Sequence, residues 1–296
     1  MYQYRPRGFF QISINIIYGE KMTNPLQKHF RRPAIHLKLP SRGKHWPEHS
    51  LDLPLNGEIP VLPMTARDEI ALKTPDALLN GAGVVSTIQS CCPNILDAWQ
   101  TPATDIDAIL IAIRIATYGN NLDLNSKCPK CEHDNEHQLN LNSVLDSIQI
   151  PDFETPLNND GFIVQFQPQN YLVSNTINQI GFEQQRAMEV IQNLNIDDAA
   201  KSHEFNNHMA RILEITIGNL AKSTASLTTP EGEVVTDQEH IKEFYLNTNS
   251  KFVDTLQKKI AEFSEALTIK PFKVACTECT TEYEVNFTFD YSNFFA

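Results

Sequence analysis

The stretch KCPKCEH, residues 127–133, places two cysteines three positions apart in a chain that contains six cysteines. A second pair with the same spacing lies in ACTECTTEYEV, residues 275–285. This spacing lets two sulfurs converge from one tight turn, and Zn²⁺ prefers four ligands arranged in a tetrahedron. The sequence therefore predicts one structural metal centre with four thiolate ligands: Cys128, Cys131, Cys276 and Cys279.

Both cysteine pairs are expected between two short β-strands. Residues 121–125 lead into the first pair and residues 137–141 lead out of it, and residues 269–275 and 283–289 flank the second pair in the same way. A turn that holds two cysteines between strands is a zinc knuckle, and two knuckles form a zinc ribbon. The predicted fold class is therefore α+β, with a zinc-ribbon-like β-module formed by two distant CxxC knuckles, a large helical insertion and an extended N-terminal arm.

The distance between the two knuckles along the chain is unusual. They are separated by the 144 residues from 132 to 275, whereas about 15–20 residues separate the pairs of an ordinary zinc site of this type. A metal ion that joins such distant segments removes loop-closure entropy from the unfolded chain. We therefore expect the metal to contribute substantially to stability.

Other chemistry at the same cysteines stays open on the sequence alone. An iron–sulfur cluster also takes four cysteinate ligands. A thioredoxin-like CxxC needs a helix after the motif, and strands follow both pairs here, so redox chemistry is disfavoured. His133 and His137 could replace a thiol, although solvated loop positions are more common for such residues. Cys91 and Cys92 end a short helix and are expected to pack in the core.

Composition and charge restrict the class of protein. The chain has 296 residues, 41% of them apolar, and a formal net charge of −12. A protein that binds duplex nucleic acid normally presents a basic face to the phosphates, so nucleic-acid binding is disfavoured. No run approaches the roughly 18 apolar residues of a membrane span, so no membrane span is expected.

The N-terminal stretch does not have the pattern of a signal peptide, because polar residues interrupt its apolar part and no small-residue cleavage site follows. Met22 could be the initiator, in which case residues 1–21 are an upstream extension. Maturation in the cytosol keeps thiols reduced, so paired cysteines favour metal or redox chemistry over disulfides.

The pattern along the chain predicts four segments. Residues 1–63 form the extended N-terminal arm, with seven prolines after residue 22, and residues 64–120 form a helical core. Residues 121–150 plus 266–296 form the split metal-binding β-module, and residues 151–265 form the mainly helical insertion. The arm, with one short strand near residues 34–39, must lie along a surface of its own domain or of a partner.

The helix expected from Thr104 to Gly119 is the clearest in the sequence. Thr104 is expected to cap it, and its apolar residues cover nearly every side, so it should be central and buried. Arg114 in such a helix needs a partner, and we expect a carboxylate. The candidates are Asp68, Glu69 and Asp107.

Further helices are expected before and after this one. Thr65 and Asp68 form the N-terminal signal of an earlier helix. In the insertion, helices are expected at residues 176–194 and 200–220, and a third opens at Thr236 with a capping box and continues to about residue 263.

No motif of a common enzyme class is present. The sequence contains no GxxxxGK[ST], no HExxH and no GxSxG, and no GxGxxG follows a strand. Its carboxylates have no context that requires them for acid–base catalysis. We therefore expect a protein that makes contacts with other proteins and is not an enzyme.

Two long stretches and the first cysteine pair resemble a known family. They are PMTARDEIALKTPDALLNGAGVVSTIQSCCPNILDAW (63–99), PATDIDAILIAIRIATYGNNLDL (102–124) and CPKC. The beginning NPLQKHFRRPAIHLKLPSRGKHW and the end, TDQEHIKEF and CTECTTEYEVNFTFDYSNFF, are similar too. Over nearly all of residues 22–296 the chain resembles the T4-type bacteriophage baseplate protein family, whose members are hub subunits of contractile-tailed phages.

The resemblance implies a structural role in the virion. It implies a component of the tail baseplate in the hub region, assembled in the host cytoplasm, present in several copies and in contact with other hub and wedge proteins. It implies no catalysis, and it places the metal site on the same four cysteines. The alternatives are a baseplate assembly factor that the virion does not retain and a zinc-ribbon protein that binds nucleic acid.

Overall fold

A computed structural model describes residues 24–74, 80–193, 198–286 and 294–295. Contacts divide the chain into two units, Met1–Arg31 and Arg32–Ala296. In the first unit, a short 3-10 helix, η1 (Pro25–His29), exposes Leu26. All other described elements belong to the second unit.

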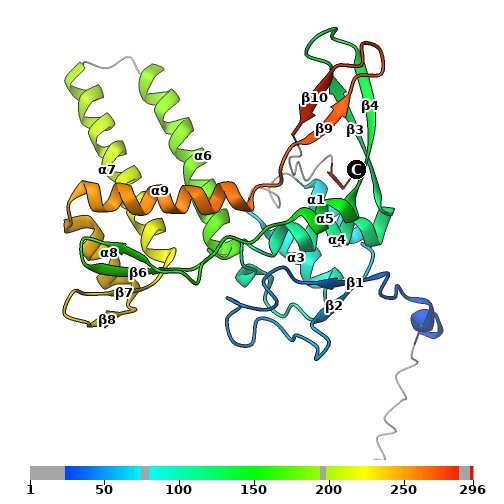
Figure 1. Ribbon diagram of the computed structural model, residues 1–296, viewed down its shortest axis with the longest axis horizontal. Coiled ribbons are helices and arrows are strands. Elements are labelled where there is room, and N and C mark those ends of the chain that lie inside the picture. Colours follow the sequence, from blue (N-terminus) through cyan, green and yellow to red (C-terminus); the bar gives the residue numbers. More distant parts are fainter. Residues whose placement is uncertain (1–23, 75–79, 194–197, 287–293, 296) are drawn as a thin grey trace, which may run out of the picture. The chain divides into compact units, whose positions relative to one another are not determined.

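The second unit is a mixed α+β fold built on small antiparallel sheets (Figure 1), which confirms the predicted fold class. In its described part there are three two-stranded sheets: β1 (Ile35–Lys38) with β2 (Glu58–Val61), β3 (Asn121–Lys127) with β4 (Asp134–Asn140), and β9 (Phe272–Ala275) with β10 (Glu282–Val285). A four-stranded sheet has the order β5 (Leu157–Asn159), β6 (Phe162–Phe166), β7 (Thr224–Thr228), β8 (Val234–Val235).

The helices fall into two groups along the chain. The first group is α1 (Ala66–Lys73), α3 (Ala82–Cys91), the 3-10 helix η2 (Ala98–Gln100), α4 (Ile106–Tyr118) and α5 (Leu141–Ser147). The second group is α6 (Tyr171–Asn193), α7 (Asp198–Lys222), α8 (Gln238–Asn247) and α9 (Ser250–Leu267). Strands β5 and β6 precede the second group, and β7 and β8 interrupt it.

Helix α4 lies at the centre of the first hydrophobic cluster, as its sequence predicts. All eight residues from Ala108 to Ile115 are buried. Helices α3 and α5 contact α4, and so do strands β1 and β2. A helix that is apolar on nearly every side is stable only when neighbours cover it on every side, and these elements do so.

Part of the predicted arm supplies side chains to this cluster. Leu37, Leu39, Ile59 and Val61 are almost fully buried in it. Burial of one such side chain stabilises the fold by about 1.5–3 kcal/mol relative to exposure. Between residues 35 and 61 the chain therefore lies along its own unit, which is one of the two arrangements that the sequence left open.

A second hydrophobic cluster joins the four-stranded sheet to helices α7, α8 and α9. Aromatic rings dominate it: Phe162 meets Phe252 edge to face, with ring centroids 5.6 Å apart. The hydroxyl of Tyr245 lies 2.9 Å from the hydroxyl of Thr224. Burial raises the pKa of Tyr245 to about 12.

The helix expected from Thr236 to about residue 263 is two helices. Helix α8 ends at Asn247, and α9 begins after Asn249, whose side chain accepts a hydrogen bond from the backbone N–H of Phe252. Asn and Thr compete with helical hydrogen bonds and favour caps, so the run Asn-Thr-Asn ends one helix and starts the next. The cap of α8 is Asp237 rather than Thr236.

The start of α1 follows its prediction, with a capping box between Thr65 and Asp68. The start of α4 does not, because Asp105 rather than Thr104 occupies its N-cap. The strand expected at residues 283–289 is β10 as far as Val285, and its remaining residues 287–289 lie outside the described residues.

The hydroxyl of Thr104 is buried without a hydrogen-bond partner in the described structure. An unpaired buried hydroxyl costs about 1–3 kcal/mol, so Thr104→Val, which keeps the shape and removes the polar group, is expected to raise the free energy of unfolding by about 1 kcal/mol. Urea denaturation checks this. A loss of stability in Thr104→Val would show that the hydroxyl has a partner.

The prediction that Arg114 pairs with a carboxylate is wrong. Its Nε donates to the main-chain carbonyl of Phe294 at 2.8 Å, and its guanidinium lies over the ring of Tyr118, 4.4 Å from the centroid. Asp68 caps α1 instead, and Glu69 accepts from the Tyr118 hydroxyl. A backbone carbonyl satisfies a buried guanidinium N–H without the desolvation of a second charge.

Asp107, in the first turn of α4, gives the stability of the protein a pH dependence. Burial raises the pKa of Asp107 to about 6, and burial also raises the pKa of Asp105. An aspartate whose pKa is higher in the folded state loses stabilisation as pH rises from the unfolded pKa to the folded pKa. Asp107→Asn removes this loss, so we expect it to be more stable than wild type at pH 7, by about 1–2 kcal/mol, and no more stable at pH 4.

Denaturation of both proteins at each pH measures this difference and cancels other titrations, such as those of the cysteines. A difference that does not change between pH 4 and pH 7 would contradict the raised pKa.

Candidate metal centre

The four cysteines lie at the ends of two β-hairpins that stand side by side (Figure 1). Cys128 follows β3 directly, and the chain turns through Cys131 into β4. Cys276 follows β9 directly, and the chain turns through Cys279 into β10. The strands expected on both sides of each pair are therefore present.

The two turns have the same backbone hydrogen bonds. The N–H of Cys128 donates to the carbonyl of His133, and the N–H of Cys276 donates to the carbonyl of Thr281, both at 3.0 Å. The cysteines are five residues from their partners in each case. Two stretches with different sequences thus adopt one knuckle conformation.

A left-handed residue occupies the same place in each turn. Glu132 has φ 58° and Thr280 has φ 57°, and each lies four residues after the first cysteine of its pair. The N–H of each donates back to the carbonyl of that cysteine. Residues other than glycine rarely adopt a left-handed backbone conformation unless the surrounding structure requires it. Here the turn that brings two sulfurs together requires it.

The sulfur atoms fit a single tetrahedral ion. All four lie within 4.8 Å of one another. Cys128 Sγ is 3.7 Å from Cys279 Sγ, and Cys131 Sγ is 3.6 Å from Cys276 Sγ. A disulfide has sulfurs about 2.05 Å apart, whereas metal–sulfur bonds of about 2.3 Å in a tetrahedron place them about 3.8 Å apart.

Thr281 favours the thiolate form of Cys279. Its hydroxyl lies 3.3 Å from Cys279 Sγ. Hydrogen bonding by the side chain and then by the backbone of Thr281 lowers the pKa of Cys279 to about 6. The thiolate is the form that binds metal, so this contact prepares a ligand.

Asn135, which the sequence analysis missed, joins the two hairpins. This side chain is 2% exposed. Its Oδ1 accepts from both the N–H and the hydroxyl of Thr277 at 2.9 Å, and its Nδ2 lies 3.7 Å from Cys276 Sγ. The only signal was a polar residue on the same face of a strand as His137 and Leu139, the face that packs inward.

The structure places neither His133 nor His137 in the cluster of four cysteines. His137 Nε2 lies 3.1 Å from the hydroxyl of Tyr283, which also contacts Ser126 Oγ at 2.7 Å. The expectation of a solvated loop position is therefore wrong for His137, because it lies in β4 at the contact between the two hairpins. Cys91 and Cys92 are fully buried in the first hydrophobic cluster, as expected.

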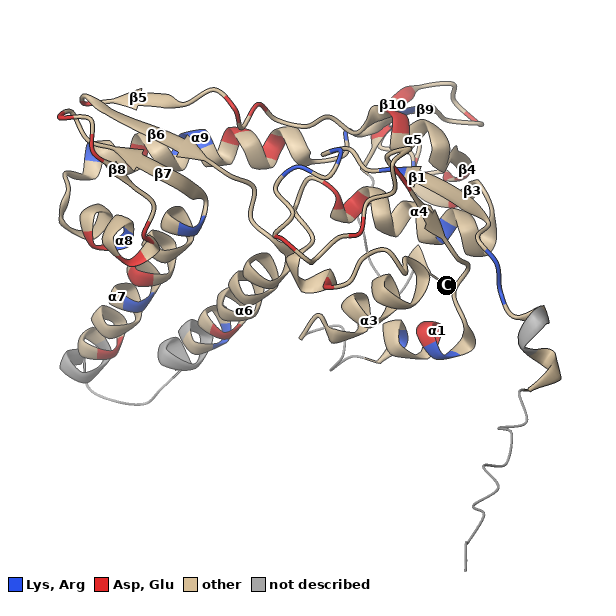
Figure 2. Ribbon diagram, turned by 90° about the horizontal axis from the view of Figure 1, so that it is seen from below, with Lys and Arg blue, Asp and Glu red and all other residues tan. Residues whose placement is uncertain are grey.

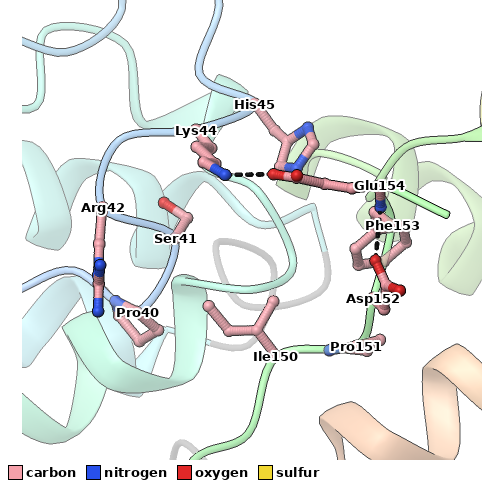
Figure 3. A pocket seen from close by; sticks show the side chains of 10 residues that line it. All are labelled: Pro40, Ser41, Arg42, Lys44, His45, Ile150, Pro151, Asp152, Phe153 and Glu154. Carbon is pink, nitrogen blue, oxygen red and sulfur yellow. Dashed lines mark hydrogen bonds and ion pairs between the residues drawn. The ribbon is translucent and has the colours of Figure 1, made fainter.

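A pocket of about 350 Å³ lies between residues 40–45 and residues 150–154 (Figure 3). Lys44 and Glu154 form an ion pair between these two segments. Ser41 lines the pocket, but its hydroxyl donates to Asp105 at 2.5 Å. Burial, followed by the charge of Lys44, lowers the pKa of His45. The Ser41 hydroxyl bonds the Asp105 carboxylate directly rather than through a histidine, so these residues do not form a catalytic triad.

No helix in the described residues is both long and apolar enough to cross a bilayer. A family model described as T4 bacteriophage base plate protein matches residues 33–296, a range that includes all four clustered cysteines. No curated protein and no solved structure matches the chain.

Proposed function

The chain belongs to the T4 bacteriophage base plate protein family, and from this premise we propose that it is a structural component of the hub region of a phage tail baseplate. The match over residues 33–296 supports a role that uses most of the chain rather than one small motif. Membership of the family implies a place in the virion tail and other baseplate proteins as partners. Baseplate proteins are typically non-enzymatic, and a purely structural role agrees with this.

The four cysteines are proposed to hold one Zn²⁺. The observation that carries this proposal is the set of sulfur distances, 3.6 and 3.7 Å across the two pairs. In a four-iron cluster each cysteinate binds its own iron, and in a two-iron cluster two cysteinates bind each iron. Either inorganic core would hold some of the cysteine sulfurs further apart than the 4.8 Å within which all four lie here. A zinc ion with four thiolates has no open position, so its role is to join the two hairpins.

The split β-module is proposed to act as a rigid unit, because the metal joins two hairpins that 144 residues, 132 to 275, separate along the chain. Asn135 and Tyr283 reinforce the same contact from opposite hairpins. A tail that contracts needs parts that keep their shape, and a metal-bound module meets this need. The large helical segment between the knuckles is then an insertion in one module.

The N-terminal segment is proposed to contact other hub and wedge proteins. In η1 and just after it, Leu26 and Phe30 are 62% and 59% exposed. Large exposed apolar side chains that lie close together in sequence are common at protein contacts. Residues 35–61 belong to the core, so the partner contact is assigned to the residues that precede them.

Two measurements test the proposed function. Mass spectrometry of purified virions separates a baseplate component from an assembly factor, because only a component remains in the finished particle. Cryo-EM of the tail then tests the hub position. A protein found in infected cells but never in virions, and never with tail proteins, would contradict the proposal.

A nucleic-acid-binding zinc ribbon is the weaker alternative. The net charge is −12, and Figure 2 shows Lys and Arg interspersed with Asp and Glu along the described chain. Phosphate contacts need a surface where positive charge gathers. We expect no gel shift with duplex or single-stranded DNA at physiological salt.

A further inference from the structure

Helices α6 and α7 lie side by side in opposite directions (Figure 1), and they expose large apolar side chains. On α7, Phe205, Met209 and Leu213 are 44%, 36% and 55% exposed. These residues are spaced by four, so they form a single stripe along one face of the helix. Nothing in the described chain covers this stripe.

The stripe continues into a groove between the two helices. Ile212 and Thr216 of α7 line this groove, which has a volume of about 390 Å³, and helical spacing makes them neighbours of Met209 and Leu213. Across the groove lie Gly181 and other residues of α6. The stripe and the groove therefore form one continuous surface, which we call the α6–α7 face.

The α6–α7 face carries no formal charge among its described groove residues, since none of them is Lys, Arg, Asp or Glu. A second groove, which α8 helps to line, adjoins the first and differs from it in charge, because Glu214, Lys222, Glu239 and Lys242 line it. Partners that are selected by charge would use the second groove. Two copies of a chain with net charge −12 meet most easily through a surface without charge.

Two features of the α6–α7 face have no explanation within one copy. Gly181 is in a helix interior, where glycine costs up to about 1 kcal/mol relative to alanine, and a Cβ added there would meet nothing within 4 Å. His208 is 6% exposed, lines the groove, and has no hydrogen-bond partner for its Nε2 in the described structure. Close approach of another chain would use the space beside Gly181.

We propose that the α6–α7 face binds the same face of a second copy of this chain, with the two α7 helices antiparallel and Met209 at the two-fold axis. In this arrangement Phe205 of each copy meets Leu213 of the other, because both lie four residues from Met209. The α6–α7 pair of one copy and the α6–α7 pair of the other then form a four-helix bundle, which is a common arrangement for paired helices with apolar stripes. An isologous contact uses one surface twice, so no further patch is required.

Sedimentation velocity of the full-length protein tests the proposal, and a dimer is the expected result. Met209→Glu and Met209→Lys each place two like charges at the axis, so each variant alone is expected to be a monomer. A mixture of the two is expected to restore a dimer, because Glu of one copy then faces Lys of the other. Val234→Glu, at a 61% exposed position on β8, is the matched control and should remain dimeric.

Three results would overturn the proposal: a wild-type monomer at about 100 μM, a dimer in both single variants, or a mixture that stays monomeric. Thermal unfolding shows that each variant is folded, and Leu213→Glu repeats the test at a more exposed site of the same stripe. The test uses purified protein and does not depend on the baseplate role, so failure of one proposal leaves the other intact.

Discussion

Cys276→Ser is expected to release the bound metal and to separate the β9–β10 hairpin from the β3–β4 hairpin. A cross-link that closes a loop of more than 100 residues stabilises a folded chain by about 5 kcal/mol, and 144 residues lie between Cys131 and Cys276. The remaining contacts between the hairpins are side-chain hydrogen bonds, such as that of Asn135 to Thr277. We therefore expect a loss of about 3–5 kcal/mol, a lower melting temperature, and rapid proteolysis near residue 276.

Elemental analysis and thermal unfolding of the same samples check this expectation. Wild type should be colourless with one zinc per chain, and visible absorbance with iron would assign a cluster instead. Glu278→Gln is the matched control, because Glu278 lies in the same turn and is exposed, so it should keep both metal and melting temperature. An unchanged melting temperature in Cys276→Ser, or in wild type after a chelator removes the metal, would contradict a structural metal.

The four cysteines of this candidate centre could be predicted from the sequence because the CxxC pattern is local. A CxxC spacing, a strand before it and a strand after it are all visible within about ten residues. Asn135 could not be predicted, because its role exists only when two hairpins from distant parts of the chain meet. The left-handed conformations of Glu132 and Thr280 were hidden for another reason, since neither is the glycine that normally marks such a position.

The fold divides in a similar way into local features that could be predicted and contacts that could not. Helix α4 was predicted because its apolar residues occur on every side, which requires a central position. The partner of Arg114 was not, because a main-chain carbonyl such as that of Phe294 has no signature in a sequence. The break between α8 and α9 had a local signal at Asn249, but the long amphipathic pattern on both sides concealed it.

Asp105→Ala is expected to destabilise the first hydrophobic cluster by about 3–5 kcal/mol, because it leaves two buried donors and one part-buried donor without an acceptor. Asp105 is fully buried at the start of α4. It accepts from the N–H of Ser41 at 2.8 Å, from the hydroxyl of Ser41 at 2.5 Å, and from Nε1 of Trp46 at 2.7 Å. One carboxylate therefore fixes residues 41–46, which follow β1, to the central helix.

The same geometry predicts a graded series in guanidinium denaturation. Asp105→Asn keeps one oxygen acceptor and should lose less stability than Asp105→Ala. Trp46→Phe removes a single donor and should lose least, about 1 kcal/mol from the hydrogen bond. Since the loop from residue 41 leads to β2, whose Ile59 and Val61 are core residues, the alanine variant should also expose this strand to hydrogen exchange. Equal losses in all three variants would show that packing of Trp46, and not the carboxylate, holds the loop in place.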